Sequence, residues 1–170
     1  LIYLPSYITD KNYLHIPTGL QFIVIVFIFA SMYLGEQREF YYHFWWWDSM
    51  LHLIYGMGMG FIGFVMVYIL NKNENIDVVL SPIFIAVFAF SFAVTIGVFW
   101  EIFEFWMDTI FGLNMQKSGL VDTMFDLMED CGGALITSTI GYFYIKTKRP
   151  SRFQQYLSEV LEKNKKLFKN

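Results

Sequence analysis

The sequence has little of what soluble, disulfide-linked or thiolate-metal proteins are built from. Charged residues make up only 16% of its 170 residues, well below their share in soluble domains, so an ordinary soluble domain is excluded. Cys131 is the single cysteine, which excludes an intrachain disulfide and a thiolate cage for a metal. The chain has neither an initiator methionine nor a basic start followed by an apolar signal segment, so we expect further sequence upstream of Leu1.

Hydrophobic residues are abundant instead. They form 56% of the chain and aromatic residues form 21%, which indicates an integral membrane protein. We predict an all-α fold, a polytopic transmembrane helix bundle of about four spans followed by a C-terminal amphipathic helix. The spans are expected near residues 20–34, 49–70, 82–107 and 124–145. The bundle would occupy residues 1–149 and a basic amphipathic tail helix residues 150–170, which leaves no room for a second folded domain.

Charge is unevenly distributed along the chain, whose formal net charge is −3. Lys146, Lys148, Arg149 and Arg152 follow the fourth predicted span directly, and the positive-inside rule therefore puts the C-terminus in the cytoplasm. By alternation, the second span begins, the third ends and the fourth begins on the outer side of the membrane. The lipid bilayer is the expected environment, and no nucleic-acid partner is expected.

Ionisable residues recur at helical spacing at these three outer helix ends. They are Asp48 and His52 in the second span, Glu101, Glu104 and Asp108 in the third, and Asp122, Asp126, Glu129 and Asp130 in the fourth. Spacings of three and four residues put side chains on one face of a helix. An ionisable group that faces hydrocarbon costs about 2.5 to 3.5 kcal/mol even on lenient scales, so such groups persist where they meet a partner, a cation or water. The sequence therefore predicts one shared polar site at the outer side.

Many carboxylates and an imidazole form a donor set for hard or borderline cations. Like charges at close range cannot all ionise in poorly solvated surroundings, so either some acids are protonated or a cation neutralises them. Oxygen-rich sites suit Ca²⁺, Mg²⁺, Mn²⁺ or iron, and zinc less well. The predicted metal ligands are His52, Glu101, Glu104, Asp122 and Asp126. Asp48 and Asp108 are the predicted catalytic residues, as general bases toward a bound water.

Each part of this cluster also has an interpretation that needs no ligand. The acids at the start of the fourth span can serve as an N-cap and interact with the helix dipole. Asp48 and His52 can hydrogen-bond to each other and to a backbone carbonyl. Glu101 and Glu104 have no capping role, although they could extend to the lipid headgroups from a helix end. We therefore favour a functional role most strongly for these two glutamates.

The motifs together resemble a known family. They are Trp47-Asp48-x-x-x-His52, Trp100-Glu101-Ile102-x-Glu104, Asp108, Asn114-Met115-Gln116, Asp122-Thr123-Met124-x-Asp126 and Gly133-Ala134. In this combination the chain, from about Leu4 to Ile145, resembles the YjdF-like family of uncharacterised bacterial membrane proteins. A fainter similarity is to VanZ-like proteins, which share the order of an Asp-x-x-x-His helix, a Glu-bearing helix and an acidic helix start. The resemblance implies the fold type and the bacterial cytoplasmic membrane, and it supplies no established activity.

Three functions fit these features. The first is a metal-dependent hydrolase or transferase that acts on a lipid or envelope precursor. The second is a cation or proton transporter or channel element, which would need a polar route across the inner halves of the spans, where almost no polar residues occur. The third is a non-enzymatic subunit, in a homo-oligomer or a larger membrane complex, with a tail that docks to a partner or to anionic lipid. The sparse polar groups disfavour transport.

Overall fold

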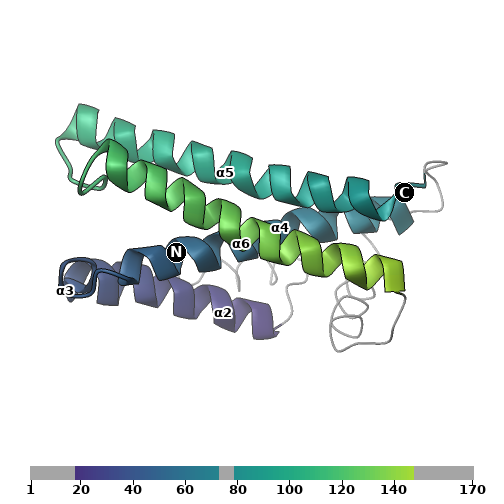
Figure 1. Ribbon diagram of the computed structural model, residues 1–170. Helices are drawn as coiled ribbons and strands as arrows, with labels where there is room; N and C mark the ends of the chain where they lie inside the picture. Colours follow the sequence, from purple (N-terminus) through teal and green to yellow (C-terminus); the bar gives the residue numbers. More distant parts are fainter. Residues whose placement is uncertain (1–17, 73–78, 148–170) are drawn as a thin grey trace. The chain divides into compact units, whose positions relative to one another are not determined.

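The computed structural model describes residues 18–72 and 79–147. Its helices are α2 (Thr18–Ile28), η1 (Phe29–Gln37), α3 (Phe40–His43), α4 (Trp47–Lys72), α5 (Pro82–Phe111) and α6 (Leu120–Thr147) (Figure 1). No strand occurs in the described ranges, which confirms the predicted all-α fold. The tail helix predicted over residues 150–170 lies outside these ranges.

The first predicted span is a helix with two geometries. The α-helix α2 continues directly into the π-helix η1, and together they form a helix of 20 residues over Thr18–Gln37, about 30 Å long. That length matches the hydrocarbon core of a bilayer. No side chain of α2 is buried within the chain, as expected for a helix whose apolar surface faces lipid. The helix is longer than the predicted 20–34 because it includes the polar Glu36 and Gln37.

Helices α4, α5 and α6 pack against one another in a separate unit. The Ser81 side chain caps α5 by accepting a hydrogen bond from the Phe84 amide at 3.3 Å, and Pro82 occupies the first turn. Gly112 ends α5 in the left-handed conformation, with φ at 66°, so the helix runs four residues beyond the predicted 107. Asp108 therefore lies on the last helical turn.

Within residues 18–72 and 79–147, three helices are long and apolar enough to cross a membrane: Thr18–Gln37, Trp47–Asn71 and Pro82–Phe111. Helix α6 has 28 residues, which is sufficient length, but it is not one of the three. Its first half contains four acids and its second half is rich in small and hydroxyl residues, so no long window of it is strongly apolar. The structure confirms a helical bundle, and the fourth span stays a prediction.

The chain direction brings three helix ends to one place. Helices α5 and α6 are antiparallel neighbours joined by the loop over residues 112–119, and α4 begins at the end of the bundle where α5 finishes (Figure 1). The start of α4, the end of α5 and the start of α6 are the segments that contain the predicted site residues. At the opposite half the core is apolar, with Phe64, Ile85 and Ala89 almost fully buried.

Glycines permit the close approach of α4 and α6. A Cβ atom added to Gly133 would collide with the backbone carbonyl of Leu53 and would lie 2.7 Å from the Met57 amide nitrogen. These are backbone atoms, which cannot move away as a flexible side chain can. The spacing between α4 and α6, and hence between the side chains at their ends, depends on this glycine.

Gly133→Ala is therefore expected to destabilise the protein by about 1 to 3 kcal/mol, because the two helices must separate. Gly58→Ala is the matched control, since nothing lies within 4 Å of its added Cβ. We expect this control to be neutral or stabilising by about 0.5 to 1 kcal/mol through helix propensity. The measurement is the midpoint of thermal unfolding in detergent, and equal behaviour of the two variants would contradict the packing described here.

Candidate metal site

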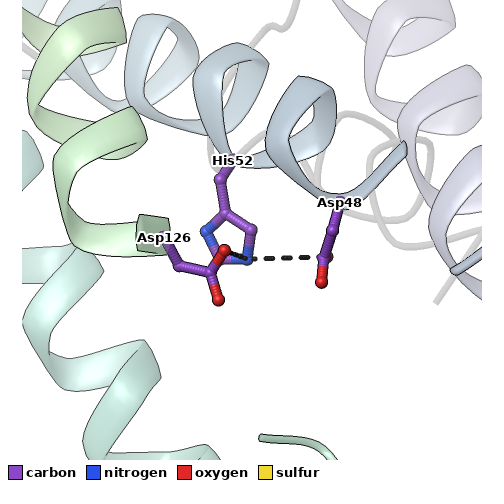
Figure 2. Close-up of side chains that lie close together, drawn as sticks. All are labelled: Asp48, His52 and Asp126. Atoms are coloured by element: carbon purple, nitrogen blue, oxygen red, sulfur yellow. Dashed lines mark ion pairs between the residues drawn. The ribbon is translucent and has the colours of Figure 1, made fainter. Parts of the chain in front are cut away.

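His52 lies among carboxylates contributed by α4 and α6. Its Nε2 atom is 3.9 Å from Asp48 Oδ1, one turn earlier on α4, and 3.8 Å from Asp126 Oδ1 on α6 (Figure 2). These separations are too long for hydrogen bonds. They are normal between two ligands of one ion, which lie about 3 to 4.5 Å apart when each is about 2.0 to 2.4 Å from the metal. The geometry therefore suits a cation between the three side chains.

The other ring nitrogen of His52 faces Asp130. Nδ1 lies 3.3 Å from Asp130 Oδ1, and the Asp130 residue is only 1% exposed. When Nδ1 donates its proton to this carboxylate, the lone pair of Nε2 is directed toward Asp48 and Asp126. A carboxylate behind a histidine in this way is the usual arrangement that orients a metal-binding imidazole.

Asp130 can occupy this position because two glycines leave space for it. A Cβ atom on Gly97 of α5 would collide with Asp130 Oδ2, and one on Gly56 of α4 would collide with the Asp130 carbonyl oxygen. The residue is thus enclosed by all three helices of the unit. Oδ2 itself has no hydrogen-bond partner among the described residues.

Helix α5 adds two buried glutamates to the same end of the bundle. Glu101 is 4% exposed and Glu104 is also buried. One ligand atom from each of them and one from Asp126 all lie within 4.8 Å of one another. Neither carboxylate oxygen of Glu101 has a hydrogen-bond partner of normal geometry among the described residues. Three buried acids this close together cannot all be ionised without a cation or shared protons that offset their repulsion.

We call Asp48, His52, Glu101, Glu104 and Asp126 the central cluster. Their ligand atoms form two groups, Asp48–His52–Asp126 and Glu101–Glu104–Asp126, and Asp126 belongs to both. All five were predicted as site residues from the sequence, four as metal ligands and Asp48 as a base. Helices α4, α5 and α6 each contribute at least one of them.

Lys117 attaches the α5–α6 loop to the cluster. Its Nζ atom donates to Asp48 Oδ2 at 2.6 Å, and both side chains are largely shielded from solvent. The other oxygen of Asp48 is the one that faces His52. The lysine therefore holds Asp48 in place and supplies one positive charge at the edge of the cluster.

The remaining predicted residues, Asp108 and Asp122, shape this loop. Both oxygens of Asp108 accept backbone hydrogen bonds, from Met115 at 2.7 Å and Gln116 at 2.8 Å. Asp122 Oδ2 accepts from the Lys117 amide at 3.0 Å. Neither acid belongs to the two groups of ligand atoms. The structure thus assigns both side chains loop contacts, and their predicted catalytic and ligand roles stay predictions.

The electrostatics at Asp122 reflect the crowding of acids. Burial raises the pKa of Asp122 above its usual range, and the neighbouring Asp48 carboxylate acts in the same direction. The Lys117 charge and amide oppose both effects. The loop lysine is therefore the local cation that offsets repulsion between the two aspartates.

Comparison with known proteins places the chain in a family. A family model described as a predicted membrane protein (DUF2238) matches residues 1–147. The chain belongs to the DUF2238 family. The YjdF-like resemblance of its motifs is to this same family and is confirmed, whereas similarity to VanZ-like proteins is not shown. An uncharacterized protein of Thermotoga maritima is 31% identical over 153 residues, which cover 86% of this chain and 72% of the relative. No solved structure matches this DUF2238 chain.

Two residues of this DUF2238 protein have roles that the sequence alone does not indicate. Lys117 is not among the predicted site residues, and Asp130 is predicted only as one of the acids of the fourth span. The sequence does contain a signal for Asp130, because Asp122, Asp126 and Asp130 follow one another at intervals of four residues and therefore lie on one face of the helix. Its place behind His52 depends on how α4 and α6 are rotated against each other, which spacing within one helix does not determine.

Proposed function

We propose that this protein holds a divalent metal ion in the central cluster and uses it to hydrolyse or transfer a group on a lipid or envelope precursor. The family match supports an integral membrane protein. The convergence of ligand atoms from three helices supports a bound cation. From the charge pattern of the sequence, we propose a bacterial cytoplasmic membrane location with a cytoplasmic C-terminus.

The observation on which this proposal depends is the state of Glu101. A buried carboxylate without partners loses its hydration and gains nothing in return, which costs several kcal/mol. Both oxygens of Glu101 lack a hydrogen bond of normal geometry among the described residues, with Thr123 as a nearby side chain, and they lie beside two further acids, Glu104 and Asp126. A divalent cation removes the penalty of all three at once. Oxygen donors with one imidazole favour Mg²⁺, Mn²⁺, Ca²⁺ or Fe²⁺.

Such an ion would supply Lewis-acid chemistry and an activated water. Asp48 Oδ1 faces His52 while the other oxygen of this carboxylate is bound to Lys117, so Oδ1 is placed either to bind the ion or to accept a proton from that water. Asp108 is less suited to proton transfer, because both its oxygens already accept backbone hydrogen bonds.

The surface beside the two glutamates supports a lipid substrate. Large aromatic side chains are exposed on α5 around them: Trp100, Phe103, Phe105 and Trp106. In a bilayer these rings would contact acyl chains and headgroups. A lipid-linked substrate could therefore reach Glu101 and Glu104 laterally, from within the membrane.

Transport is disfavoured by the core beyond the cluster. Among the described residues, the buried polar side chains outside the central cluster are Asp130, which orients His52, and Ser138. The Ser138 hydroxyl donates to the Leu135 carbonyl of its own helix. Phe64 and Ile85 fill the interior there. A polar route for ions through this half of the unit is absent from the described residues, which suits a site at one end of the helices.

The proposal is tested on the full chain purified in detergent and equilibrated with MnCl₂. The wild type should retain Mn²⁺ after gel filtration, and the double variant Glu101→Gln/Glu104→Gln should lose at least one equivalent per chain. Glu36→Gln is the matched control, the same substitution at an exposed acid outside the cluster, and should bind as the wild type does. Equal Mn²⁺ content in wild type and double variant would refute the site.

The enzymatic part needs a second measurement. Sealed vesicles of bacterial lipid that contain the wild type and Mn²⁺ should release or modify a lipid product, whereas vesicles with the double variant should not. Flux of Mn²⁺ across the same vesicles without lipid turnover would contradict the hydrolase or transferase and support transport.

A further inference from the structure

The ligand atoms of the central cluster do not form one compact set. Those of Asp48 and His52 are grouped with Asp126, and those of Glu101 and Glu104 are grouped with Asp126, but the two groups remain separate. Donors that bind one ion lie no farther apart than about 4 to 5 Å, twice the metal–ligand distance. A single ion in the present geometry therefore uses one group and leaves the other unneutralised.

We infer that the central cluster holds two divalent cations at adjacent positions, bridged by the Asp126 carboxylate. This inference rests on the proposed function and specifies its metal content. One position lies between Asp48, His52 and Asp126, and the other lies between Glu101, Glu104 and Asp126. A carboxylate has two oxygens, so Asp126 can bind one ion with each, as acids do in two-metal enzymes whose ions are about 3.5 to 4 Å apart.

Burial and charge both support two ions. Glu101 is more than nine-tenths buried, and apart from an interaction with the Thr123 side chain neither of its oxygens has a hydrogen bond of normal geometry among the described residues, although they lie near Glu104 and Asp126. If the only bound ion lay next to His52, Glu101 would remain a buried acid without a neutralising cation. When all four carboxylates of the cluster are ionised they carry four negative charges, of which Lys117 offsets one at Asp48, so a single divalent ion leaves an excess of negative charge that a second ion removes.

Each position has its own support from the surrounding residues. In the tautomer in which His52 Nδ1 donates a hydrogen bond to Asp130, Nε2 is available as the one nitrogen ligand of the first position. Asp130 is here a positioning residue, since its oxygen lies behind the ring. At the second position all donors are carboxylate oxygens. The two positions should therefore differ in affinity, with softer ions preferring the one that contains His52.

The test is the number of Mn²⁺ ions per chain and their magnetic coupling. The full chain in detergent is dialysed against MnCl₂, and bound Mn²⁺ is counted by elemental analysis and examined by electron paramagnetic resonance at low temperature. We expect two ions per chain in the wild type, with the spectrum of an exchange-coupled pair. His52→Ala and Glu101→Gln should each keep one ion, and both should give the spectrum of an isolated Mn²⁺.

Glu129→Gln is the matched control, because Glu129 lies on α6 one turn from Asp126 yet belongs to neither group. It should keep two coupled ions. One uncoupled ion in the wild type, lost in both His52→Ala and Glu101→Gln, would overturn the pair and leave the proposed single-metal function intact. No bound Mn²⁺ in the wild type would overturn both proposals. The wild-type count and spectrum decide the question even if a variant fails to fold.

Discussion

Asp126→Asn is expected to remove both Mn²⁺ equivalents and, with them, all stabilisation of the protein by the metal. Among the described residues, Asp126 is the side chain that the two groups of ligand atoms share, so its loss removes a ligand from both. Asparagine keeps the shape of the side chain but can no longer bridge two cations with two anionic oxygens. A ligand at 100 times its dissociation constant stabilises the folded state by about 2.7 kcal/mol per site. The wild type should gain at least this from saturating Mn²⁺, and the variant nothing.

The measurement is the shift of the thermal unfolding midpoint between excess EDTA and excess MnCl₂, in detergent and at constant pH. Glu129→Gln, on the same helix, should show the wild-type shift. A full Mn²⁺-dependent shift in Asp126→Asn would mean that the ion binds elsewhere.

Glu101→Gln is expected to stabilise the protein when no metal is present and to destabilise it, relative to the wild type, in saturating Mn²⁺. Without metal, Glu101 is a buried acid beside Glu104 and Asp126, and apart from an interaction with the Thr123 side chain it has no hydrogen bond of normal geometry among the described residues. Replacing it by the neutral isostere removes both the repulsion and an unsatisfied charge, which should stabilise the metal-free protein by about 1 to 3 kcal/mol. In saturating Mn²⁺ the order reverses, because the variant has lost one ion-binding position.

The two unfolding midpoints of Glu101→Gln are compared with those of the wild type in EDTA and in MnCl₂. Glu36→Gln, at an exposed position, should match the wild type in both conditions. A variant less stable than the wild type even in EDTA would indicate that the Glu101 carboxylate has a stabilising partner within the protein. That result would remove the main support for a cation.

The helices could be predicted well from local sequence, and their ends were right where a residue determines them locally. Ser81 and Pro82 start α5 close to the predicted residue 82, because a hydroxyl cap and a proline in the first turn act within four residues. The predicted end near residue 107 is four residues too early. Gly112, which accepts a left-handed conformation, is the physical stop. The π-helical geometry of η1 has no comparable local signal.

The candidate site could be predicted in part. Spacing placed Asp48 and His52 on one helix face, and the order of the spans placed them near the end of α5 and the start of α6. The pairing across helices was not predictable, because it depends on helix rotation. Gly56 and Gly97 set that rotation by making room for Asp130. The spacing of residues within one helix does not show which residue of a neighbouring helix such a glycine contacts.

Loop geometry explains the remaining differences. Asp108 and Asp122 have the same residue type and nearly the same position along the helices as the acids of the cluster, so the sequence could not separate them. Their oxygens accept backbone hydrogen bonds from residues 115–117. Such bonds depend on the path of the α5–α6 loop, which follows from the two left-handed glycines, Gly112 and Gly119, acting together.

The central claim is that acids from α4, α5 and α6 share bound cations, and anomalous X-ray diffraction from crystals grown with MnCl₂ tests it most directly. Two anomalous peaks are expected, one on each side of the Asp126 carboxylate. The first should lie next to His52 and the second next to Glu101 and Glu104. A single peak at the cluster would support one shared ion. Well-ordered side chains at the cluster with no anomalous peak among them would contradict the claim.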